Sequence, residues 1–175
     1  FEPGDSILFK RGDTWREELV ITSSGTEDAW ITFGTYDSGQ KPRILGSTQA
    51  VDWTEVDGHP GVWRSATPLE RPEVGKASSI FFGDLTGLTS WGRVQATDEV
   101  PECDGDYSFL LEEHDWCWSD DAVFVYAPED PGTRYAFVEV PQRRTAVGME
   151  SHAPAEYIAI DGLELEYTTM YGYDD

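Results

Sequence analysis

Basic residues, cysteines and long apolar runs are all scarce in this sequence of 175 residues. Twelve Lys and Arg stand against 34 Asp and Glu, which gives a formal net charge of −22 at pH 7. A chain this acidic repels phosphate backbones and anionic lipid surfaces, so we expect no nucleic-acid partner. It contains no run of about 18 apolar residues, so we also expect no insertion into a membrane.

The acidic surface has two explanations, which can hold together. It is the solvated surface of a secreted or salt-adapted protein, or part of it coordinates Ca²⁺, the one cofactor that the sequence suggests. The first residues, 1–5, lack the basic and apolar regions of a signal peptide, which predicts a chain already trimmed after secretion. The abrupt end at Asp175 suggests a fragment of something longer. We therefore expect a secreted or cell-surface protein.

Only two cysteines are present, Cys103 and Cys117, and they flank an aromatic and acidic segment. In a chain with extracellular character, this arrangement predicts a disulfide, with two buried free thiols as the alternative. Closing a loop of this length would stabilise the fold by roughly 3 kcal/mol in the chain-entropy model.

The composition favours β-structure. Seven Trp, eight Tyr and eight Phe accompany 17 Gly and 10 Pro, and 39% of the residues are hydrophobic. Aromatic side chains favour strands, while Gly and Pro favour tight turns. We therefore expect a packed, nearly all-β protein built from many short strands.

A repeat is present in residues 1–48. The separation between Ile7 and Ile31, in two apolar runs, equals the separation between Val20 and Ile44, in two others. Two different runs therefore recur with one period, which lies in the twenties. Such a period is typical of a solenoid, in which equivalent strands of successive turns pair in parallel around one apolar interior.

The period is lost over residues 49–149, which we expect to form a β-rich insertion packed on the solenoid. Two apolar runs, Ala122–Tyr126 and Tyr135–Val140, are separated by a polar loop with Pro and Gly, as between antiparallel strands. After this insertion, Tyr157–Tyr167 alternates apolar and polar residues around Asp161-Gly162, so the solenoid resumes in residues 150–175.

Three segments resemble the secreted right-handed parallel β-helix proteins of the pectate-lyase-like superfamily. The opening residues Gly4–Trp15 resemble the first turn of these proteins, Trp30–Ser47 resembles the second, and Tyr157–Leu163 resembles the strand and turn that re-enter the helix. The resemblance implies an all-β fold: a right-handed parallel β-helix, N-terminal portion, with an inserted antiparallel β-rich excursion.

The same resemblance implies a protein that acts on or binds polysaccharide, as a polysaccharide lyase or glycoside hydrolase. Catalytic groups of the superfamily usually lie on later turns, so we expect them to be missing from this chain. β-Helices also form adhesins and fibres. The alternative is therefore a non-catalytic structural or adhesive surface protein that self-associates along the ends of its helix.

Three residues are candidates for catalysis. Asp174 and Asp175 form an adjacent acidic pair after the resumed solenoid, and a glycoside hydrolase needs two carboxyl groups. Arg143 belongs to the one adjacent basic pair and would clamp a sugar acid, with a structural pairing to nearby acids as the alternative.

The densest group of chemically useful side chains is His114-Asp115-Trp116-Cys117-Trp118. Exposed indoles stack on sugar rings, so Trp116, Trp118 and His114 are candidate substrate-binding residues. The alternative for the two tryptophans is a place in the hydrophobic core of a β-rich insertion.

Overall fold

The computed structural model describes residues 1–69, 79–86, 89–92, 102–119, 121–149 and 154–169. Within these ranges the protein is all-β, with a single helical turn, α1 (Pro131–Arg134). The chain divides into two compact units, which are described separately. The first contains Phe1–Gly46 and Thr145–Thr168, and the second contains Ser47–Arg144 together with Thr169.

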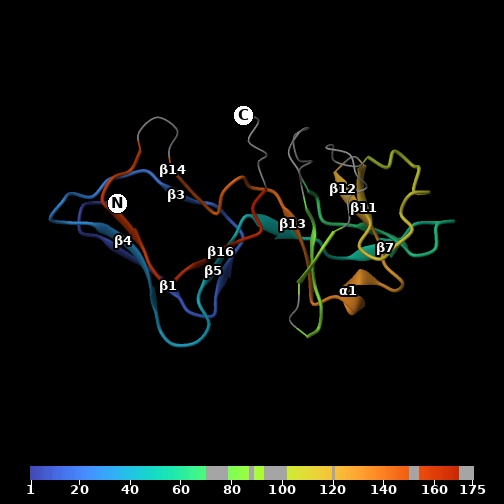
Figure 1. The fold of residues 1–175 in the computed structure, drawn as a ribbon, viewed down its shortest axis with the longest axis horizontal. Coiled ribbons are helices and arrows are strands. Elements are labelled where there is room, and N and C mark those ends of the chain that lie inside the picture. Colours follow the sequence, from blue (N-terminus) through green and yellow to red (C-terminus); the bar gives the residue numbers. More distant parts are fainter. Residues whose placement is uncertain (70–78, 87–88, 93–101, 120, 150–153, 170–175) are drawn as a thin grey trace. The chain divides into compact units, whose positions relative to one another are not determined.

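The first unit consists of parallel strands only, as far as the structure describes it. Strands from both ends of the chain lie side by side here, blue and orange-red in Figure 1. One sheet has the order β1 (Ser6–Lys10), β4 (Ile31–Tyr36) and β15 (Ile158–Ile160); a second has β2 (Thr14–Trp15), β5 (Arg43–Leu45) and β16 (Glu164–Glu166); a third pairs β3 (Leu19–Ile21) with β14 (Val147–Met149).

The chain visits these three sheets in the same order on each pass. The first pass runs β1, β2, β3; the second runs β4, β5 and, after the second unit, β14; the third runs β15 and β16. The whole second unit therefore stands in place of the short connection that joins β2 to β3 in the first pass. The parallel pairing predicted for the late Asp-Gly segment is present, since β15 pairs with β4 and β16 with β5.

Alternation along the strands of the first unit fills its core. Ile31 and Phe33 of β4 are both completely buried, and Ile21 of β3 joins them in one hydrophobic cluster. The intervening residues face outward, because successive side chains of a strand point to opposite sides. On that outer face Leu8 is 52% exposed and lies across Gly34, where a Cβ atom would come within 3.3 Å of the leucine side chain.

The equal spacing along the sequence predicted the wrong residue pairs between neighbouring strands. Ile7 stands opposite Phe33 rather than Ile31, a shift by one alternation that keeps the same face inward. Val20 and Ile44 are not equivalent at all, because Ile44 pairs with Trp15. The partner of β3 comes after the inserted unit, and the corners between strands differ in length, so equal spacing along the sequence does not give equal positions.

The second unit contains two four-stranded sheets in which all neighbouring strands are antiparallel. One sheet has the order β10 (Thr89–Trp91), β9 (Phe81–Gly83), β13 (Phe137–Pro141) and β6 (Ser47–Gln49); the other has β11 (Trp116–Ser119), β12 (Ala122–Tyr126), β8 (Val62–Ser65) and β7 (Trp53–Glu55). We name them the β13 sheet and the β12 sheet.

Each face of the β12 sheet contributes to a different hydrophobic cluster. Trp116 and Trp118 pair across the ladder with Val125 and Val123, and all four pack with residues of the β13 sheet in the main core. Cys117, between the two tryptophans, faces the opposite side and a smaller cluster. The strict alternation of a pleated strand therefore buries both faces of this sheet.

The predicted neighbours Ala122–Tyr126 and Tyr135–Val140 do not pair with each other. The first belongs to the β12 sheet and the second to the β13 sheet, so the expectation of a simple antiparallel connection is wrong. The polar loop between them contains α1, which begins after Asp130. The Asp130 carboxylate accepts a hydrogen bond from the Gly132 backbone N–H at 2.8 Å, and Pro131 occupies the first helical position. Both features favour a helical turn, which carries the chain between sheets.

The predicted disulfide is confirmed: Cys103 is bonded to Cys117, with their Cα atoms 5.6 Å apart. In addition, the Cys103 backbone N–H donates to the Trp118 carbonyl at 2.8 Å. Among the residues of known placement, no helix is long and apolar enough to cross a membrane.

Candidate functional site

The two tryptophans proposed for sugar stacking lie in the core. Trp116 and Trp118 are each 1% exposed, so neither indole face reaches solvent. The alternative given with the prediction, a structural position, holds for both side chains. Their indole N–H groups have no hydrogen-bond partner in the part of the chain that the structure describes.

His114 lies beside these tryptophans in sequence but at the edge of a pocket in the structure. Its backbone has a φ of 76°, a left-handed conformation that is uncommon for residues other than glycine. Its imidazole packs against Phe82 and Tyr135, with ring centroids 4.6 and 5.5 Å away. The Nε2 atom lies 4.0 Å from Oε1 of Glu113.

Glu113 is the centre of a small polar network. Arg134 donates to it from Nε at 2.7 Å and from Nη2 at 3.2 Å, and the Tyr135 hydroxyl donates at 2.8 Å. The Arg134 hydrogen bonds lower the pKa of the Glu113 carboxyl, opposed by partial desolvation. Burial is the main cause that raises the pKa of the Tyr135 phenol. These hydrogen bonds fix the position of the ionised Glu113 carboxylate.

Acid titration tests this network. Because the pKa of Glu113 is depressed in the folded state, its contribution to stability is present above about pH 4.3, the ordinary glutamate value, and is lost as the pH falls further. We expect Glu113→Gln to lower the melting temperature by a few degrees at pH 7 and to differ less from the parent near pH 3. Thermal unfolding followed at both pH values measures this. An equal difference at both pH values would contradict the assignment.

Together with Asp84 and Ser90, this network lines a pocket of about 290 Å³. We name it the Glu113 pocket. Its one Lys or Arg side chain, Arg134, is also 3.3 Å from Glu129, so two carboxylates already neutralise it. The pocket is therefore poorly suited to bind an anionic group.

The structure does not bring the catalytic candidates together. Arg143 donates from Nη1 to the Ser47 carbonyl at 3.0 Å, a structural bond to the backbone rather than to an acid. Asp174 and Asp175 lie outside the described residues. No group of three or more His, Cys, Asp or Glu that would hold a metal ion occurs in the described ranges, so the Ca²⁺ expectation has no ligand set there.

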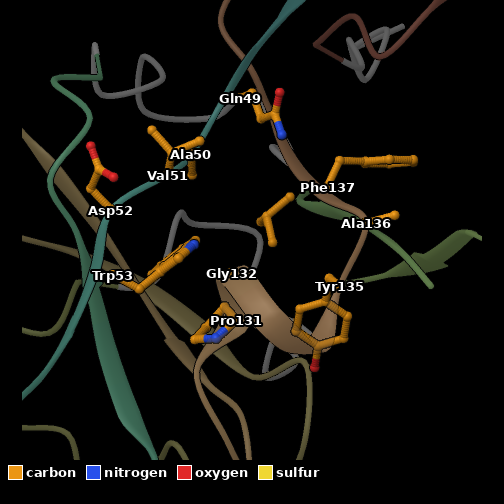
Figure 2. A pocket seen from close by; sticks show the side chains of 11 residues that line it. Gln49, Ala50, Val51, Asp52, Trp53, Pro131, Gly132, Tyr135, Ala136 and Phe137 are labelled. Carbon is orange, nitrogen blue, oxygen red and sulfur yellow. The ribbon is translucent and has the colours of Figure 1, made fainter. Parts of the chain in front are cut away.

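A second pocket, of about 250 Å³, lies in the same unit and is shown in Figure 2. We name it the Trp53 pocket. It is lined by residues of two stretches of chain: Gln49, Ala50, Val51, Asp52 and Trp53 from the first, and Pro131, Gly132, Tyr135, Ala136, Phe137 and Val138 from the second.

This pocket forms where the chain passes from one sheet to the other. The Ala50 backbone N–H donates to the Val138 carbonyl at 2.9 Å, beside the ladder of β6 and β13. Asp52 then adopts a left-handed conformation, with φ of 55°, and the chain enters β7 of the β12 sheet at Trp53. The second stretch of lining residues begins in α1 and continues into β13 of the β13 sheet. The pocket lies between these two connections from one sheet to the other.

The side chains around the hollow combine an aromatic surface with polar groups. Trp53 is partly buried and packs against the main core, and Gln49 and Asp52 supply an amide and a carboxylate. Sequence reasoning missed this site, because its two halves are far apart along the chain. The available signal was local: Asp130-Pro131 is typical of the start of a helical turn, and α1 forms one side of the pocket.

Comparisons with known proteins show similarity of fold. Neither models of protein families nor curated protein sequences match the chain. Among solved structures, "The complex structure of XylC with xylose" matches with 20% identity and a TM-score of 0.57 over 91% of this chain and 30% of that one. A chain described as "Glycoside hydrolase" matches with 14% identity and a TM-score of 0.55, over 95% and 44%. The chain thus spans less than half the length of either.

Proposed function

We propose that this chain is a portion of a carbohydrate-active protein built on a right-handed parallel β-helix that acts on or binds polysaccharide. The observation that carries the proposal is the repeated order of parallel strands in the first unit, in which β4 pairs with β1 on one side and β15 on the other. The likeness to a xylose-bound protein and to a glycoside hydrolase supports it.

In this proposal the second unit is an antiparallel insertion within one turn of the helix. Strands β14, β15 and β16 then belong to the turns that follow it. The insertion expected from sequence, residues 49–149, overlaps most of the compact unit Ser47–Arg144. Because β14 pairs with β3, we place residues 147–149 in the helix rather than in the insertion.

Charge restricts the glycan. At a net charge of −22 the chain repels pectin-like or other uronate polymers unless cations bridge the two. A neutral glycan therefore fits better. The reaction would be that of a polysaccharide lyase or glycoside hydrolase.

An extracellular location belongs to the same proposal. The Cys103–Cys117 disulfide is compatible with an oxidising compartment, where such bonds persist.

A second candidate function is a structural rod or adhesin. It is favoured by the last described pass, whose side chains Ile160 and Leu165 are large, apolar and exposed. Apolar end faces of this kind associate with one another when nothing else covers them. A rod would need no active site.

One experiment separates the two functions. The protein is incubated with a panel of neutral and acidic polysaccharides, and both bound glycan and released oligosaccharides are measured. We expect binding to neutral glycans, with product release if the reaction groups are present. Neither binding nor release on any glycan, together with concentration-dependent polymers in sedimentation, would overturn the carbohydrate proposal in favour of the rod.

A further inference from the structure

We propose that the Trp53 pocket of the second unit binds one neutral sugar residue of a glycan, with the Trp53 indole as its stacking surface. This inference rests on the proposed carbohydrate function and goes beyond it by naming the site, the residues and the charge class of the ligand.

Size sets the first limit on the ligand. The pocket has a volume of about 250 Å³. Pockets for drug-sized ligands span about 300–1,000 Å³, so this one accommodates a single ring better than a chain of rings. A longer glycan would place one residue inside and leave the rest in solvent.

The lining supplies the two kinds of contact that a sugar ring needs. A sugar has C–H groups that stack on aromatic faces and hydroxyl groups that need hydrogen-bond partners. In Figure 2 Trp53 and Tyr135 lie on either side of Gly132, and the nitrogen end of the Trp53 indole is turned toward the middle of the pocket. Gln49 also lines the pocket.

The Trp53 indole N–H remains available to a ligand. It makes no hydrogen bond to any residue that the structure describes, whereas the indole of Trp63, in the neighbouring strand β8, donates to the Ala127 carbonyl at 3.1 Å. A ligand hydroxyl in the hollow would accept this hydrogen bond in exchange for one to water.

Charge decides between neutral and acidic sugars. No Lys or Arg lines the Trp53 pocket, and Asp52 contributes its one ionisable carboxylate. A uronate would therefore meet like charge without a cation to neutralise it. The neighbouring Glu113 pocket does not provide that cation either, since Arg134 is already paired with Glu113 and Glu129.

The walls are held in place before any ligand arrives. The Asp130 carboxylate fixes the backbone of Gly132, and the Thr133 and Arg134 backbone N–H groups both donate to the Asp130 carbonyl at 2.9 Å. On the other side the Val51 backbone N–H donates to the Thr67 hydroxyl at 2.9 Å. Walls that need no ordering reduce the cost of binding.

The test is titration of the full chain with neutral and acidic oligosaccharides, among them xylo-oligosaccharides and oligogalacturonates, followed by calorimetry. We expect Trp53→Ala to weaken binding of a neutral oligosaccharide at least about tenfold, which corresponds to about 1.4 kcal/mol. The matched control is Trp30→Ala, which removes an exposed indole of the first unit. It should leave the affinity unchanged.

A second pair of variants protects the test against misfolding of Trp53→Ala. A Cβ atom on Gly132 would come within 3.3 Å of Oδ1 of Asp130 and within 3.7 Å of Cδ1 of Trp53, so side chains at this position approach the indole. Gly132→Leu should narrow the pocket and weaken binding more than Gly132→Ala. Both variants make the same close contact with Asp130, so Gly132→Ala is the control for any loss of melting temperature or affinity that this contact causes.

The outcomes are distinguishable. Binding of neutral glycan that survives both Trp53→Ala and Gly132→Leu overturns the site but leaves the carbohydrate function standing. Loss of binding in Trp30→Ala alone moves the site to the first unit and overturns the inference. Preference for the acidic oligosaccharide, abolished by Trp53→Ala, would overturn the charge class. Absence of binding to every glycan overturns the proposed function itself.

Discussion

Replacement of Phe33 by alanine is expected to destabilise the first unit by about 3–5 kcal/mol, the usual cost of removing a phenylalanine from a core. Phe33 is completely buried between the passes of the chain: it stands opposite Ile7 on one side and Ile160 on the other. Its ring also meets that of Phe1 edge to face, with centroids 5.4 Å apart. Removal of the ring therefore leaves a cavity between the side chains of two neighbouring strands, and movement of only one of those strands cannot fill it.

Chemical denaturation followed by far-ultraviolet circular dichroism measures this effect, and Phe33→Leu offers a milder variant if the alanine protein does not fold. The matched control is Leu8→Ala, on the outer face of the same sheet, which should cost less than about 1 kcal/mol. Equal losses in the two variants would contradict the assignment of an inner and an outer face.

Removal of the disulfide is expected to produce the second large effect. The double variant Cys103→Ala, Cys117→Ala should lose about 3 kcal/mol, since the bond closes a loop of about 15 residues in the unfolded chain. Its sequence separation is 14 residues. The loop covers one face of the β12 sheet, where Leu110 and Phe124 belong to the same hydrophobic cluster as the two cysteines.

Denaturation of the parent protein with and without a reducing agent measures the same contribution independently. The reduced parent and the double variant should agree within about 1 kcal/mol, the usual uncertainty of extrapolation to water. If both lost no more than an exposed surface substitution does, about 0.5 kcal/mol, the apolar contacts of Leu110 and its neighbours would hold the loop without the bond.

Local sequence patterns predicted where the strands lie better than they predicted which strands pair with each other. The runs around Ile7, Ile31 and Ile158 are strands, because alternation and turn residues are local signals. The equal spacing of apolar runs gave a wrong prediction for Val20, because the pairing of its strand depends on a distant segment. Val20 lies in β3, whose partner β14 is separated from it by the second unit, so no repeat confined to residues 1–48 contains that information.

The site was harder to predict for the same reason. His114 does reach a pocket, but Trp116 and Trp118 point to one buried face because they alternate with Cys117 along β11. A sequence shows such alternation but not which face is covered. The Trp53 pocket depends on a backbone bend at Asp52 and on α1. The sequence around each of them does not indicate that these two distant segments come together to line one pocket.

The placement of the second unit inside one pass also determines the order of events during synthesis. Glu18, just before β3, contacts Thr145, just before β14, across 127 residues of chain. At translation rates of about 5–20 residues per second, β3 waits roughly 6–25 s for its neighbour to leave the ribosome. The nascent chain therefore carries an unpaired strand throughout that interval, and rapid, independent folding of the intervening segment would keep the delay from growing beyond the time of synthesis.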